Sequence, residues 1–318
     1  MTLNIREYDP TKKISEPGIY RMGINDYHSD CCDAPSVSSG DLVTICASGE
    51  EYWDQSYFNP HAEKPKHKPH LKLGNAAHAK IIDPKHWIED YILRPAGHRS
   101  WRSEAAQDWR MIQERGGKIA ITKEEVEIVD GMAQRLLDDP DAQAILSDGY
   151  PELSFFARYE DIWIKCRPDY MPVYDLAFEA DYKTAAEVDV QSIERAIEKW
   201  KYHQKLANIA WVKRQLKADF PDLPPVTECA FALIFQKTKR PYGITTVNIE
   251  PHDIIQLASA NAYAMDIAAK CFRGEMRWPG YTEGIHKFER NSWDRNALEH
   301  KIGSGIYPKV NDAMEITK

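Results

Sequence analysis

Three charged residues in the middle of the chain are spaced so that they could act on a phosphate ester. Asp181 and Lys183 lie two residues apart in a strand-like stretch, so their side chains share one face, roughly 6.6 Å apart. Asp169 ends the preceding strand-like stretch and could reach the same point. Two carboxylates suit Mg²⁺ or Mn²⁺, and a nearby lysine can orient a water or offset phosphoryl charge. These parts could hydrolyse a phosphodiester, although D-x-K also occurs as an incidental ion pair at a solvated strand edge.

Other residues with metal-binding or orienting chemistry lie along the chain on both sides. His78 lies four residues after Gly74 on a predicted helix, and Glu152 opens a strand upstream of Asp169. Tyr202 and Gln204 lie on the helix after the lysine. Each has an ordinary reading as well: a hydrogen-bonded structural histidine, a strand-edge carboxylate and a solvated helix face.

The elements that must position these residues follow from periodicity and from helix caps and breakers. Thr122 with Glu125 is typical of a capping box, and Pro84 is expected to end the helix that carries His78. We predict helices at about 39–53, 73–82, 123–137, 190–218 and 252–273, and strands at 152–158, 162–167, 173–182, 230–237 and 243–249. Strands clustered between helices favour one mixed α/β domain with an N-terminal elaboration.

Composition and missing motifs exclude several classes of protein. The chain has 318 residues, 43% of them hydrophobic, which is an ordinary globular profile. No stretch approaches about 18 consecutive apolar residues, and the N-terminus does not resemble a signal peptide, so we expect a cytoplasmic protein without a membrane span. The six cysteines form no C-x-x-C pair, which disfavours zinc ribbons and iron–sulfur clusters. No Walker, Rossmann, zincin or α/β-hydrolase motif is present.

The charge distribution is uneven. The net charge is −8, and residues 122–161 alone carry eleven acids against three bases. In contrast, residues 61–103 carry nine Lys and Arg against four acids, together with six histidines. A local basic stretch can meet phosphates even in an acidic protein. The Lys/His/Pro segment 61–70 could be a basic loop near phosphate or could simply be exposed to solvent.

The ordered set of motifs resembles the RecE-like branch of the PD-(D/E)xK nuclease superfamily, and in particular phage and prophage exonucleases. The matching motifs are G-x-x-x-H at 74–78, Glu152, K-C-R-P-D at 165–169, D-x-K-T at 181–184, and Tyr202 with Gln204. The N-terminal flank matches at 18–20, 27–28 and 36–40, and the C-terminal flank at Trp278-Pro279-Gly280-Tyr281 and Ile285, so that the likeness covers roughly residues 15–298. The chain departs from the pattern in the Tyr202–Gln204 spacing, at Asn208, where the family often has tyrosine, and at Glu179, which could be a spare ligand or could face solvent.

This resemblance implies a restriction-endonuclease-like core, with a central mixed sheet flanked by helices. It implies an N-terminal elaboration at 1–70, a nuclease domain at 71–298 and a polar tail at 299–318. Asp169 and Asp181 would hold Mg²⁺, which Mn²⁺ could replace, and His78 and Glu152 would be further metal ligands. Lys183 would position the attacking water, and Gln204 and Tyr202 would help to hold the site or the DNA end.

The implied activity is exonucleolytic digestion of linear double-stranded DNA, 5′→3′, leaving 3′ single strands for recombination. Expected partners are DNA ends, a RecT-like annealing protein and further copies of the chain in a trimeric or tetrameric ring. The expected setting is the bacterial cytoplasm, with a phage or prophage as the source of the gene. The alternatives are a structure-specific or restriction-type endonuclease on the same core, and a DNA-end-binding module without activity.

Overall fold

The computed structural model describes residues 3–62, 72–173, 178–219, 221, 228–282, 284, 287–310 and 316–317. Positions 63–70 of the basic segment and Ile285 of the C-terminal motif lie outside these residues. The chain divides into one unit at Met1–Trp278 and a second at Pro279–Lys318. The second unit contains helix α12 (Ser292–Gly303), capped by Asn291, and the short pair β13 (Lys309–Val310) and β14 (Ile316–Thr317).

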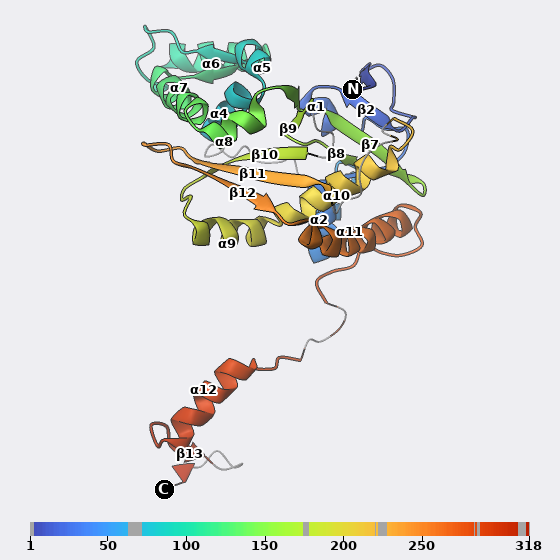
Figure 1. The fold of residues 1–318 in the computed structure, drawn as a ribbon, viewed down its shortest axis with the longest axis vertical. Helices are drawn as coiled ribbons and strands as arrows, with labels where there is room; N and C mark the ends of the chain where they lie inside the picture. The colour runs from blue at the N-terminus through green and yellow to red at the C-terminus, as the bar shows by residue number, and fades with distance from the viewer. Residues whose placement is uncertain are drawn as a thin grey trace. The chain divides into compact units, whose positions relative to one another are not determined.

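Two five-stranded mixed sheets form the framework of the first unit, which confirms the predicted mixed α/β class (Figure 1). The first sheet has the order β1 (Ile5–Glu7), β2 (Gly18–Arg21), β7 (Ser154–Tyr159), β8 (Ile162–Cys166) and β3 (Ser36–Ser38). The second has the order β12 (Ile244–Ile249), β11 (Ala230–Lys237), β10 (Phe178–Ala185), β9 (Tyr170–Pro172) and β6 (Gly149–Pro151). A parallel pair, β4 (Tyr91–Leu93) and β5 (Ile119–Ile121), stands apart. The N-terminal segment therefore supplies three strands of the first sheet.

Helices cover both faces of the second sheet because successive apolar side chains along its strands point to opposite faces. On β11, Ile234 joins a cluster with Ala76 and Met132, whereas Leu233 and Phe235 belong to the largest cluster. The first of these faces is covered by α4 (Lys72–Ile82), α7 (Lys123–Leu137) and α8 (Pro140–Leu146). The largest cluster brings in α2 (Ser39–Ala47), α9 (Val190–Trp200), α10 (Tyr202–Gln215) and α11 (Pro251–Phe272). Figure 1 shows the two groups of helices on opposite sides of β10, β11 and β12.

The remaining helices of this unit connect these elements. They are α1 (Ile24–Tyr27), α3 (Gly49–Gln55), α5 (Pro84–Asp90) and α6 (Glu104–Arg115). Pro84 ends α4 as predicted but also stands at the first position of α5, where its missing N–H costs nothing. The capping box of Thr122 and Glu125 at the start of α7 is confirmed.

One long antiparallel hairpin joins the two sheets. On one part of it β7 pairs with β8, as in Phe155↔Cys166, and on the other β6 pairs with β9, as in Pro151↔Tyr170. Three residues separate these pairs on each strand, 152–154 and 167–169, so neither strand carries an insertion. The register therefore places Glu152 opposite Asp169, and the Glu152 amide donates a 3.1 Å hydrogen bond to the Asp169 carbonyl.

Two predicted helices are divided in the structure, and one predicted strand is shifted. The predicted helix 190–218 is two helices, because Lys201 adopts the left-handed conformation at φ 52°, ψ 43°. Of the two, α9 buries only one side, whereas α10 is buried almost all round, so the chain must turn between them. The predicted helix 39–53 is also divided, since Ser48 ends α2 and caps α3. The predicted strand 173–182 overlaps β10, which begins at Phe178 and runs on to Ala185, whereas β9 lies before the predicted range and was not predicted. Residues 174–177 lie outside the described part of the chain.

Candidate active site

A row of three carboxylates crosses the second sheet at the point where the hairpin enters it. Glu152 lies opposite Asp169 in the hairpin register, and β9 pairs with β10 through Ala180↔Tyr170. Extending that register by one residue places Asp181 opposite Asp169. Side chains that oppose one another on neighbouring strands lie close together, which explains why residues so far apart in sequence converge. The structure thus brings Glu152, Asp169 and Asp181 together.

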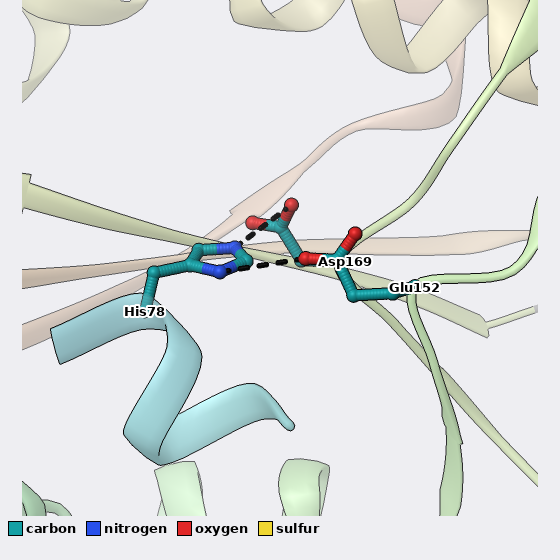
Figure 2. A group of neighbouring side chains, drawn as sticks. All are labelled: His78, Glu152 and Asp169. Atoms are coloured by element: carbon teal, nitrogen blue, oxygen red, sulfur yellow. Dashed lines mark ion pairs between the residues drawn. The ribbon is translucent and has the colours of Figure 1, made fainter. Parts of the chain in front are cut away.

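Helix α4 brings His78 to this row. The α4 backbone lies close to β10, since a methyl group at Gly74 would come within 2.6 Å of the Thr184 hydroxyl. One turn later, His78 places Nδ1 3.4 Å from Glu152 Oε1 and Nε2 3.1 Å from Asp169 Oδ1. Figure 2 shows both carboxylates on one side of the imidazole in this view, each facing one of its two nitrogens. The three side chains each offer one ligand atom, and these atoms lie within 4.8 Å of one another, close enough to hold one metal ion.

Lys183 lies between the two aspartates. Its Nζ is 3.0 Å from Asp169 Oδ2 and 2.8 Å from Asp181 Oδ2. The backbone amide of Tyr182 also donates a 2.8 Å hydrogen bond to Asp169 Oδ2. Because the lysine sits two residues after Asp181 on β10, strand geometry alone places both side chains on one face. This is the arrangement that the D-x-K spacing predicted.

Sharing one lysine gives the two aspartates different proton affinities. Burial alone would raise the pKa of Asp169, but Lys183 and His78 outweigh it and hold that pKa well below its ordinary value. For Asp181, burial and the Asp169 charge outweigh Lys183 and raise the pKa. We take the pair to share its protons, with Asp169 as the firmly ionised partner. Burial opposes the charge of His78, yet Asp169 and Glu152 raise the pKa of its imidazole.

Arg167 holds Glu152 in place and was given no role from the sequence. Its Nε donates to Glu152 Oε2, and its side chain is only 6% exposed. The same guanidinium donates to the Met22 carbonyl at 3.0 Å and to Ser154 Oγ at 2.7 Å. Glu152 itself has φ 55°, a left-handed conformation that non-glycine residues adopt rarely. The fixed guanidinium and the backbone bond to Asp169 together orient this carboxylate.

Tyr202 and Lys205 border the site from α10. The Tyr202 ring centroid is 5.9 Å from Lys183 Nζ and 5.2 Å from Lys205 Nζ. Burial and the neighbouring Lys183 lower the pKa of Lys205. Tyr202 was expected at the site and lies beside its lysine. Lys205 was not expected there; its spacing of three from Tyr202 on a helix was the available signal.

Gln204 is not brought to the carboxylates. It is buried, and its Nε2 donates to Cys46 Sγ at 3.3 Å and to Asn261 Oδ1 at 3.1 Å. Asn261 in turn donates to the Gln204 carbonyl at 3.0 Å. Asn208 also forms structural hydrogen bonds: its Nδ2 donates to Ser39 Oγ and to the Lys165 carbonyl. In this structure, Gln204 ties α10 to α2 and α11.

Glu179 neither faces solvent nor joins the carboxylate row. It is 1% exposed and forms an ion pair with the buried Lys213 on α10. Burial raises the pKa of Glu179 to about 7 against the opposing effect of Lys213. Its Oε2 has no hydrogen-bond partner among the described residues. This ion pair is a separate feature of the same strand.

Searches by sequence find no relative: no protein-family model matches the chain, and no curated protein matches it. None of the described helices combines the length and the apolar character needed to cross a bilayer. A solved structure named SSO0001 covers 62% of this chain at 11% identity, but its TM-score of 0.23 supports no argument.

A second solved structure has the same fold over nearly its whole length. It is a protein from Eubacterium rectale named "putative exonuclease", with 11% sequence identity and a TM-score of 0.55. The alignment covers 87% of this chain and 98% of that one. At this identity the likeness concerns the fold alone. This chain therefore has a mixed α/β fold that it shares with a protein named "putative exonuclease".

Proposed function

We propose that the chain is a Mg²⁺-dependent nuclease that hydrolyses phosphodiester bonds of DNA from the ends of linear duplexes. The observation that supports this most directly is the convergence of His78, Glu152 and Asp169 within 4.8 Å, beside the Asp181–Lys183 pair. The chemistry of the group matches what phosphodiester hydrolysis requires: ligands for a hard cation and an ammonium group beside them.

The donor set fits a divalent ion with oxygen preference. Glu152, Asp169 and Asp181 offer carboxylate oxygens, which suit Mg²⁺ and Mn²⁺, and His78 offers one imidazole nitrogen. The raised pKa of His78 favours an imidazolium between two carboxylates, and this proton would leave when a metal binds. A bound ion would supply Lewis acidity and lower the pKa of a water molecule.

The residues of the chain would divide the remaining work. Asp169, with a depressed pKa, stays ionised and is available as a metal ligand through Oδ1. Arg167 keeps Glu152 oriented toward His78. Lys183 is held by both aspartates, so its ammonium is placed to orient a water or to offset charge on a phosphoryl oxygen. Asp181, with a raised pKa, is best suited to complete the ligand set or to accept a proton.

The finer parts of this proposal rest on the resemblance to RecE-like exonucleases. They are 5′→3′ direction, 3′ single-stranded products, transfer of these to a RecT-like annealing protein, and assembly into a ring. No base-reading motif accompanies the site in the sequence, so we propose contacts to phosphates without sequence preference.

The test compares three DNA substrates in Mg²⁺ and in EDTA: linear duplex, covalently closed duplex and single strands. Wild type is assayed beside Asp181→Asn and beside Glu194→Gln, which removes an acid from an exposed position of α9. We expect Mg²⁺-dependent loss of linear duplex only, abolished in Asp181→Asn and retained in Glu194→Gln. A 5′ or 3′ label then gives the direction.

Other outcomes would redirect the proposal. Cleavage of closed circles would establish an endonuclease instead. Binding to DNA ends without cleavage, in Mg²⁺ and in Mn²⁺, would establish a binding module. Cleavage that survives Asp181→Asn at the wild-type rate would place the active site elsewhere.

A further inference from the structure

Lys205 is a second cation at the edge of the carboxylate site, and it differs from Lys183 in how it is paired. Lys183 contacts two carboxylates at 3.0 and 2.8 Å. For Lys205, no carboxylate lies within ion-pair distance in the part of the chain that the structure describes. Its ammonium group instead contacts the Tyr202 ring, whose centroid is 5.2 Å from Nζ. An ammonium that is half-buried beside a ring, without an anion, retains its full capacity to bind one.

The position of Lys205 relative to the site is set by Tyr202. The ring is approached by Lys183 Nζ at 5.9 Å and by Lys205 Nζ at 5.2 Å, so both ammonium groups border the same side chain. Lys205 is also close enough to Asp181 and Lys183 for their charges to act on it. Lys183 already forms ion pairs with Asp169 and Asp181. Among the described residues, Lys205 is therefore a cation at this site that no carboxylate pairs with, so it can bind a further phosphate of the substrate.

We propose that Lys205 is a substrate-positioning residue that binds a phosphate of the DNA strand next to the phosphate that is cleaved, with Tyr202 as the apolar wall between them. This rests on the proposed nuclease function and adds to it an anchoring point for the strand. An anchor of this kind acts equally in the ground state and the transition state, so its loss raises KM and leaves kcat nearly unchanged.

A purely structural role makes a different prediction. If Lys205 only offsets the negative charge of the carboxylate row, its removal would alter stability or metal affinity and leave the salt dependence of DNA binding unchanged. A phosphate contact, in contrast, releases about one counterion, which changes the slope of log Kd against log salt by about 0.9.

The experiment uses the full chain with Lys205→Met, Lys205→Arg and the control Lys199→Met, which removes an exposed lysine of α9. Values of kcat and KM are measured on linear duplex in Mg²⁺. Duplex binding is measured over a salt series in the Asp181→Asn background, where no cleavage interferes. We expect Lys205→Met to raise KM and Kd about tenfold and to lower the salt slope by about one contact. The KM and Kd of Lys205→Arg should remain within about threefold of the wild-type values. The KM and Kd of Lys199→Met should equal those of wild type.

The outcomes separate this inference from the function on which it rests. Unchanged KM, Kd and salt slope in a folded Lys205→Met would overturn the phosphate contact while cleavage by wild type upholds the nuclease. Loss of kcat alone, with tighter Mn²⁺ binding in a titration because a nearby positive charge is gone, would show a structural counter-charge. If wild type binds DNA without cleaving it and Lys205→Met weakens that binding, the anchor stands and the nuclease proposal fails. Absence of both binding and cleavage in wild type would overturn both.

Discussion

Strand β10 carries a buried carboxylate and a partly exposed one two residues apart, and the protein uses them differently. The Glu179 side chain is 1% exposed and forms an ion pair with Lys213, whose side chain is 5% exposed. Asp181 is 13% exposed and shares Lys183 with Asp169, next to a histidine that is 27% exposed. Burial raises the pKa of both Glu179 and Asp181. Burial of a carboxylate beside a lysine thus does not make a metal site. A metal site also needs more carboxylates than positively charged side chains, and it must be open enough for a metal ion to enter.

The largest effect is expected when Asp181 is neutralised, which tests whether its role differs from that of Glu179. Asp181→Asn removes one acid from a crowded group, so we expect nuclease activity to fall roughly 10³-fold. Folding stability should hold or increase, because the raised pKa shows that the fold disfavours the Asp181 charge. Activity on linear duplex and urea unfolding test the two halves. A variant that loses stability instead would show that Asp181 has the same structural role as Glu179.

The opposite result is expected at Glu179. Glu179→Ala removes the carboxylate partner of a buried lysine and leaves a cavity, so it should lower unfolding free energy by about 3–5 kcal/mol. Activity per folded molecule should stay within about threefold of wild type. The double variant Glu179→Leu/Lys213→Met should recover most of the stability, since an apolar pair of similar volume avoids the cost of burying charges. A large loss of activity in this folded double variant would assign Glu179 to the site.

A third substitution tests Gln204, which lies on α10, the helix that faces both Glu179 and Asp181. Gln204→Ala leaves the buried Asn261 Oδ1 without its side-chain donor, so we expect a loss of about 2 kcal/mol in urea unfolding. Values of kcat and KM should change less than about threefold. If activity falls a hundredfold while stability holds, Gln204 acts on the substrate in a conformation that differs from this one.

The smallest expected effect, taken per pH unit, is a pH dependence of stability. The pKa of Glu179 is raised from 4.5 to about 7, so its protonated form is favoured in the folded state. Its contribution is fully present below pH 4.5 and is lost as pH rises through 7. Wild-type unfolding free energy should decrease by up to about 1.4 kcal/mol per pH unit in this window, relative to the Glu179→Leu/Lys213→Met variant. Parallel pH profiles for the two proteins would contradict the raised pKa.

Short-range spacing explains what could be predicted from the sequence. Asp181 and Lys183 share a face because strands repeat every two residues, and the Thr122 capping box depends on four consecutive residues. The mixed α/β class followed from the order of elements. The convergence of Glu152 with Asp169 was also available in principle, because the turn at Glu160–Asp161 sets the hairpin register.

Other features depended on tertiary packing. The break at Lys201 sets the rotation of α10, and this rotation points Gln204 toward Cys46 and brings Lys205 to the site. Nothing local in a run of good helix formers marks that break. Likewise, the burial of Glu179 depends on Lys213, thirty-four residues away.

The uninterrupted hairpin register sets how this chain can change length in evolution. Glu152 and Asp169 oppose each other only while both arms between them and the tip hold equal numbers of residues. Deleting one residue from either arm would turn one of these side chains to the opposite face of the sheet. Extra residues at the exposed Glu160–Asp161 tip leave both arms unchanged. The tip is therefore the place where homologues can differ in length, and where an epitope tag can be inserted, without moving the carboxylates.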